Sequence, residues 1–374
     1  MAKWWPRCAA ACLAAMVWIG SASASATTIT DCDRLAADPE DSGRPMGIVG
    51  RSYFWIPAKD AIAACRDAMA EYPDEPRFEY QLARAFVALE DHHPDVLRHL
   101  RNAAEAGYPA AQYRYAVELR TGDIVPKNAA EALELHRRAA SAGIVDAMYA
   151  LGQMLEAGEG HEADLVAAVA WYREAADAGK PDAMNNLGKL LFEGRGTEKD
   201  QAAAVALFRK AADTGLPIAM YNYAYSLQKG EGITQDDVEA AKWYLKSAEA
   251  LYVPAMVKLG VMLREGAGLA KDDIAATRWM LRAAEAGNSY GMFNYAIALK
   301  NGYGVEQNET AAVEWMRKAA DAGDAEAMTF MGIVYRDGKT VPADREQARM
   351  WFRRAIDAGS DDATVALQDM DGTD

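Results

Sequence analysis

Small residues, glycine and alanine, and large apolar residues recur at fixed places along most of the chain, and the pattern repeats every 36 positions. The unit ends on a glycine, with Leu251 in the one slot that lacks it. The repeat marks are Gly107, Gly143, Gly179, Gly215, Leu251, Gly287, Gly323 and Gly359. Residues 108–359 therefore form seven units of constant length, which is the sequence signature of a repeat array.

The first half of each unit predicts an amphipathic helix. Apolar residues stand at the fourth, eighth and twelfth places after the mark, as in Ala183, Leu187 and Leu191. This spacing places them on one helical stripe. The ninth place is glycine or alanine, as in Gly188, which lets a neighbouring helix approach closely.

A glycine-containing loop and a second helix complete each unit. An Asp or Asn follows every loop, where its side chain can accept hydrogen bonds from the unpaired N–H groups of a helix start. These residues are Asn128, Asp164, Asp200, Asp236, Asp272, Asn308 and Asp344. A hairpin of two such helices cannot bury its apolar stripes alone, so we predict an all-α fold, an α-solenoid of stacked antiparallel helix hairpins.

The unit resembles a known repeat. Asp182-Ala-Met-x-x-Leu187-Gly188, then Gly-x-Gly, Asp, Ala-x-x-Trp and Ala-Ala-x-x-Gly, is similar to the Sel-one-like repeat (SLR) family, a 36-residue relative of the tetratricopeptide repeat. The resemblance implies a right-handed superhelix and adaptor or regulatory work in envelope processes. Leu251 departs from the pattern, and we expect a smoother connection and an altered stacking angle there.

The flanks of the array read as caps. Residues 75–107 resemble one shortened TPR/SLR-like unit, and residues 27–74 form an N-terminal cap with one helix predicted over Ala58–Tyr72 and an irregular stretch over 27–57. Residues 360–374 form a C-terminal cap helix and tail, with the helix over 361–370. Caps with polar outer faces keep such arrays soluble.

The N-terminus predicts a signal peptide over residues 1–26. Lys3 and Arg7 precede a short apolar stretch, and small residues lead to an A-x-A cleavage signature that ends at Ala26. The alternative is an uncleaved membrane anchor. Cleavage sends the protein to the periplasm or outside the cell, an oxidising setting in which Cys32 and Cys65 are expected to form a disulfide. Two free buried thiols remain the alternative for this pair.

Charge narrows the range of partners. The chain has 374 residues with 40 Lys+Arg against 55 Asp+Glu, a net charge of −15. An acidic surface repels phosphate backbones and anionic lipid headgroups, so we expect no nucleic-acid partner and no direct membrane insertion after cleavage.

Catalytic and metal chemistry have weak candidates. Ser226 and Lys229 match the S-x-x-K motif of penicillin-recognising enzymes, which makes a β-lactamase-like envelope hydrolase the alternative function, although no S-D-N or K-T-G element accompanies the motif. His92, His93 and His99 cluster, but ligand types without tight spacing do not define a metal site. We therefore expect no enzyme activity, no cofactor and no metal.

One face of the first helices carries the candidate binding site. It lies opposite the apolar stripe and is rich in Asn and aromatic residues, which hold a peptide backbone and supply contact area. In related repeats this side lines the concave groove. Filling of the inner curve without binding is the alternative. The predicted site residues are Tyr149, Asn185, Asn186, Lys189, Tyr221, Asn222, Tyr225, Lys258, Phe293 and Asn294.

These observations together predict an exported, non-enzymatic scaffold that binds a partner protein or peptide in its concave groove. Its oligomeric state stays open.

Overall fold

The computed structural model describes residues 28–41, 43–89 and 94–372, so the predicted signal peptide lies outside the described residues. This part of the chain holds nineteen α-helices and one short 3-10 helix, and it has no strands. The chain divides into two compact units, of which the first ends at Ala111 and the second begins at Gln112. The all-α prediction is confirmed.

The N-terminal unit contains five helical elements before the boundary helix. They are α1 (Asp31–Ala36), η1 (Tyr53–Trp55), α2 (Ala58–Glu71), α3 (Pro76–Leu89) and α4 (Pro94–Glu105). The predicted lone helix is α2, and it packs against α3, which packs against α4. The stretch 27–57 is less irregular than predicted. Thr30 caps α1 through a reciprocal capping box with Asp33, a local signal that the repeat pattern hides.

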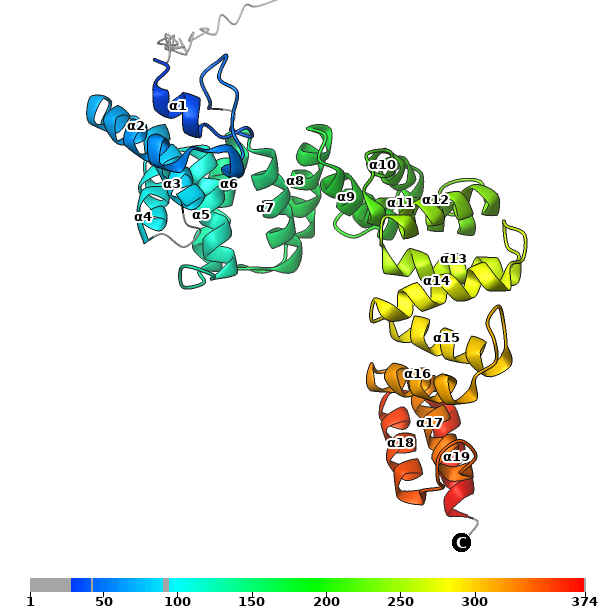
Figure 1. Cartoon of the computed structure of the whole chain (residues 1–374). Coiled ribbons are helices and arrows are strands. Elements are labelled where there is room, and N and C mark those ends of the chain that lie inside the picture. The colour runs from blue at the N-terminus through cyan, green and yellow to red at the C-terminus, as the bar shows by residue number, and fades with distance from the viewer. Residues whose placement is uncertain (1–27, 42, 90–93, 373–374) are drawn as a thin grey trace, which may run out of the picture. The chain divides into compact units, whose positions relative to one another are not determined.

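Helix α5 (Pro109–Thr121) crosses the unit boundary, and paired helices of the repeats follow it (Figure 1). From α6 onward each helix packs against the next one in the chain. Their bounds are α6 (Ala129–Ser141), α7 (Val145–Ala157), α8 (Leu165–Asp177), α9 (Pro181–Glu193), α10 (Gln201–Asp213), α11 (Pro217–Lys229), α12 (Asp237–Glu249), α13 (Val253–Glu265), α14 (Asp273–Glu285), α15 (Ser289–Asn301), α16 (Glu309–Asp321), α17 (Ala325–Asp337), α18 (Arg345–Asp357) and α19 (Asp361–Asp371).

The repeated acid or amide caps each second helix, as predicted. Asp164 Oδ1 accepts from the backbone N–H of Ala167 at 2.9 Å, and Asp200 accepts from Ala203 at 2.9 Å. The same bond forms at Asn128, Asp236, Asp272, Asn308 and Asp344. Each cap satisfies one N–H group that the helix leaves unpaired, which explains why an oxygen-bearing side chain recurs there.

The small ninth residue of the first helix sets how closely the two helices of a hairpin pack. A Cβ on Gly188 would lie 2.7 Å from the ring of Phe208, and one on Gly332 would lie 2.4 Å from the ring of Phe352. Both rings are buried, so they have no room to move away. Glycine therefore stands where an aromatic ring of the second helix covers the first helix.

Leu251 does not change the connection that it makes, so the expectation of a smoother turn is wrong. Its φ is 65°, the left-handed conformation that glycine adopts at the other repeat marks. The Tyr252 N–H donates to the Ser247 carbonyl at 3.1 Å, as the Asn288 N–H donates to the Ala283 carbonyl at 3.0 Å one unit later. Packing of the flanking helices offsets the cost of about 1–2 kcal/mol that a non-glycine residue has in this conformation.

The C-terminal helix α19 packs against α18 and α17. Met370 joins the core of the last repeat, and Arg349 donates to Asp371 at 2.9 Å. No helix in the described ranges is both long and apolar enough to cross a membrane.

Candidate functional site

The candidate site is the side of each first helix that lies opposite its apolar stripe, which we call the first-helix face. It comprises the third, sixth, seventh and tenth places after the repeat mark. On α9 these are Asp182, Asn185, Asn186 and Lys189, and on α11 they are Ile218, Tyr221, Asn222 and Tyr225.

Helix α3 of the N-terminal unit carries the same face. Its start at Pro76 matches the starts of α9 at Pro181 and α11 at Pro217, and its Leu82 stands in the place of the buried Leu187. The four matching places on α3 hold Arg77, Tyr80, Gln81 and Arg84. All four are buried in this structure, which raises the question of what covers them.

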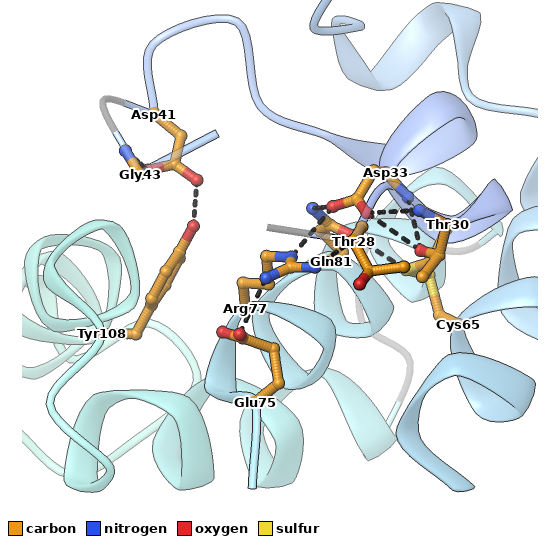
Figure 2. Close-up of polar contacts among 11 residues, drawn as sticks. Thr28, Thr30, Asp33, Asp41, Gly43, Cys65, Glu75, Arg77, Gln81 and Tyr108 are labelled. Carbon is orange, nitrogen blue, oxygen red and sulfur yellow. Dashed lines mark hydrogen bonds and ion pairs between the residues drawn. A yellow bond between two sulfur atoms is a disulfide. The ribbon is translucent and has the colours of Figure 1, made fainter. Parts of the chain in front are cut away.

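The cover is the preceding part of the same chain, residues 28–41 and 43–56, which we call the strap. Asp33 of the strap is fully buried and accepts from Arg77 Nε at 3.1 Å and from Gln81 Nε2 at 3.0 Å. Arg77 Nη2 also donates to the carbonyl of Thr28 at 2.9 Å. Figure 2 shows Arg77 and Gln81 pointing at this carboxylate.

Arg84 and Tyr80 hold the middle of the strap. Arg84 donates through Nη1 to the carbonyl of Ala36 at 2.5 Å and through Nη2 to the carbonyl of Arg51 at 2.6 Å. The Tyr80 hydroxyl donates to Asp38 Oδ2 at 2.6 Å. Side chains of one helix face therefore bind both the backbone carbonyls and the carboxylates of another segment of the chain.

Two further contacts hold the strap to the rest of the N-terminal unit. The buried Tyr108 hydroxyl donates to Asp41, as Figure 2 shows, and burial raises the pKa values of both groups. A disulfide joins Cys32 to Cys65 of α2, so the predicted bridge is present. Both cysteines are fully buried in the core of this unit.

In the repeats, the first-helix face is half-buried and links neighbouring helices through polar side chains. The Gln153 amide donates to the Tyr149 hydroxyl at 2.9 Å on α7. Asn186 Nδ2 lies 3.4 Å from the Tyr172 hydroxyl, and the Tyr149 and Tyr172 rings are 5.9 Å apart. The structure thus brings Tyr149 and Asn186 into one network.

Asn185 and Asn294 are buried, with 4% and 6% exposure, rather than on the open part of the face as expected. Asn185 accepts from Asn222 Nδ2 at 2.8 Å, which ties α9 to α11. Asn294 accepts from Arg264 at 2.9 Å, which ties α13 to α15. These two amides satisfy polar groups between adjacent first helices, and the structure gives them a packing role.

The other predicted residues stay accessible to different degrees. Tyr221 lies between two rings, at 5.4 Å from Tyr244 and 5.5 Å from Tyr252. Its half-burial raises its pKa. Lys189 is exposed, and the half-buried members are Tyr149, Asn186, Tyr221, Asn222, Tyr225, Lys258 and Phe293.

Sequence reasoning missed the occupied face of α3 and the tyrosines behind the open face. A register signal was available in the sequence, because Leu82 stands six positions after Pro76, as Leu187 stands six positions after Pro181. Tyr172 and Tyr244 lie on second helices, and a pattern restricted to first helices does not find them.

The structure shows where the described residues of the alternative hydrolase and metal-binding functions lie. Ser226 is fully buried, and its Oγ donates to the Asn222 carbonyl at 3.1 Å, so it is not presented as a nucleophile. His99 is buried, stacks on Phe86 and binds Glu79 through Nδ1 at 2.5 Å. His92 and His93 lie outside the described residues. In the described residues, no three His, Cys, Asp or Glu side chains are arranged to hold a metal.

Comparison with known proteins identifies the repeat. The family model described as Sel1 repeat matches seven segments, 109–144, 145–180, 181–216, 217–250, 253–288, 289–324 and 325–360. No curated protein matches the chain.

Two solved structures share the fold. A Sel1 repeat protein from Oxalobacter formigenes is 27% identical with a TM-score of 0.66, over 87% of this chain and 97% of the other. A protective antigen of uropathogenic Escherichia coli strains that displays an SLR fold is 27% identical with a TM-score of 0.72. This match covers 82% of our chain but only 66% of the antigen. Because the matched repeats span more than half of the present chain, this protein belongs to the Sel1-repeat family.

Proposed function

We propose that the protein is an exported, non-enzymatic scaffold that holds a partner protein or peptide along the first-helix face of its repeats. The Sel1-repeat fold is typically a protein-interaction scaffold, and its members are generally non-catalytic. The finer proposal concerns the partner-binding surface, a role in envelope processes and the compartment.

One observation carries this proposal: in the N-terminal unit, the same face already holds a polypeptide. Tyr80 and Gln81 of α3 stand in the places of Tyr221 and Asn222 of α11. On α3 these side chains bind the carboxylates of the strap. A tyrosine followed by an amide at matching places of α11 offers a partner the same hydroxyl and amide donors.

The open face suits binding for a second reason. Tyr221 and Tyr225 are half-buried, and tyrosine gives contact area with little loss of side-chain entropy. The rings of Tyr244 and Tyr252 support Tyr221. Asn222 donates to Asn185 through its side-chain Nδ2, and its side-chain Oδ1 can accept from a partner amide. The exposed Lys189 adds a cation that can pair with a partner carboxylate.

The compartment follows from the cysteines and the predicted export signal. The buried bridge between Cys32 and Cys65 suits an oxidising, extracytoplasmic setting. We therefore place the scaffold in the periplasm or outside the cell.

A double variant tests the surface without breaking the fold. Changing Asn222 would also remove its hydrogen bond to Asn185, so we choose Lys189→Ala with Tyr225→Ala. We expect the variant to lose about tenfold or more in the capture of a partner from an envelope extract, since buried tyrosines dominate such interfaces. Quantitative affinity purification with mass spectrometry measures this loss.

The matched control is Val166→Ala with Arg173→Ala, two exposed positions on the second helix α8. It should capture the same partner as the native chain, and both variants should keep the native helical circular dichroism. Equal capture by the first-helix variant and the native chain would refute the proposed surface.

A further inference from the structure

The strap carries an exposed apolar surface that the scaffold function does not use. Met46, Val49, Phe54 and Trp55 are 96%, 84%, 97% and 74% exposed, the four highest values among the large hydrophobic side chains described. Four large apolar side chains at such exposure, all between positions 46 and 55, indicate a contact site. We call these four residues the apolar turns.

Backbone hydrogen bonds within the strap fix the conformation of the apolar turns. The Ile48 N–H donates to the Pro45 carbonyl at 3.2 Å, so Met46 lies in a tight turn that Val49 directly follows. The Trp55 N–H donates to the Ser52 carbonyl at 3.0 Å, so Phe54 and Trp55 lie in a second tight turn. Between the turns, the Arg51 N–H donates to the Ala37 carbonyl at 2.8 Å.

The base of the second turn is anchored in the N-terminal unit. Ile56 is buried in the core, and the Arg84 guanidinium lies 4.8 Å from the centre of the Tyr53 ring. Phe54 and Trp55, between these anchors, project outward into solvent. The fold therefore presents the apolar side chains on a supported base.

The charge of this segment differs from that of the whole chain. Between Asp41 and Asp60 the sequence has Arg44, Arg51 and Lys59 and no acidic residue, although the chain has a net charge of −15. The side chain of Arg44 donates to the carbonyls of Asp38 and Pro39, and that of Arg51 donates to the carbonyl of Arg34. Arg44 also interacts electrostatically with the Asp41 carboxylate, so the exposed Arg51 and Lys59 are the cations that an anionic surface attracts.

We propose that the apolar turns dock the N-terminal unit onto an anionic lipid surface. Tryptophan and phenylalanine favour the boundary between headgroups and acyl chains, and nearby cations add attraction to anionic lipids. Protruding apolar side chains with the exposed Arg51 and Lys59 near them in sequence suit a bilayer, which receives them without a complementary pocket.

Vesicle binding by the purified, exported protein tests the proposal. Co-sedimentation is measured with vesicles of phosphatidylcholine alone and with phosphatidylglycerol added. We expect binding to the anionic vesicles and a loss of about tenfold or more in Phe54→Ser with Trp55→Ser, since these two side chains carry the apolar contact. Lys59→Glu should weaken binding to the anionic vesicles several-fold and leave binding to the neutral ones unchanged.

The matched control is Val166→Ser with Val238→Ser, exposed apolar residues on the repeats at 69% and 54%. It should bind vesicles as the native chain does, and all variants should keep the native melting temperature because every changed side chain is exposed. Absence of native binding to both vesicles would overturn the proposal, as would an equal loss in the control. A discrete protein adduct from a photo-crosslinker placed at Trp55, with no lipid binding, would overturn it in favour of a protein partner.

Discussion

Arg77→Met is expected to destabilise the N-terminal unit by about 3–5 kcal/mol, because it leaves the fully buried Asp33 carboxylate without its cation. Gln81 and Thr30 still donate to that carboxylate, but neither supplies charge. The strap should then open more often than the rest of the chain unfolds. Hydrogen exchange of residues 31–37 measures this opening directly.

The control for this change is Arg101→Met. Arg101 pairs with Glu105 at 2.7 Å on the surface, and both side chains are 61% exposed. A surface pair contributes about 0–1 kcal/mol, so strap exchange should stay near the native rate. If Arg77→Met accelerates exchange no more than Arg101→Met does, the buried ion pair does not hold the strap.

His136→Phe is expected to reduce the loss of unfolding free energy that the second compact unit, the one that begins at Gln112, suffers at acid pH. His136 is fully buried, and neither ring nitrogen has a hydrogen-bond partner. Burial, aided by the nearby Arg120 charge, lowers its pKa to about 4 from an ordinary value of 6.5. Phe208 and Phe352 occupy the same slot in other repeats, so phenylalanine fits there.

The direction of this pH dependence of stability follows from proton binding by His136. Between pH 6.5 and about 4 the unfolded chain protonates this imidazole and the folded chain does not, so stability falls as the pH falls through this window. The loss approaches about 3 kcal/mol at the acid end. Urea unfolding at about pH 7.5 and about pH 4.5 measures this loss of unfolding free energy in the native protein and in the variant. A variant that loses as much stability between these pH values as the native protein would contradict the assignment.

Most of the fold could be predicted because each unit repeats the same local signals. The caps at Asp164 and Asp200, the glycine at Gly188 and the small–large pairing with Phe208 all act within one hairpin. Leu251 was misjudged because stacking of the neighbouring hairpins holds it in a conformation that its own preference opposes.

The site could be predicted only in part. Helical periodicity places Asn185 and Asn294 on the first-helix face, but it does not tell the open part of that face from the flank that meets the next first helix. The strap occurs once and makes polar contacts to residues 33 to 67 positions away in sequence, so no periodic pattern reports it. The disulfide between Cys32 and Cys65 could be predicted because only two cysteines remain after the signal peptide.

The central claim is that the first-helix face of the repeats holds a polypeptide partner as α3 holds the strap. Site-specific photo-crosslinking in cells tests it most directly, with benzoylphenylalanine placed at Tyr225 on α11 or at Val238 on α12. We predict a discrete protein adduct from position 225 and none from position 238. An adduct from position 238 alone, or equal adducts from both positions, would contradict the claim.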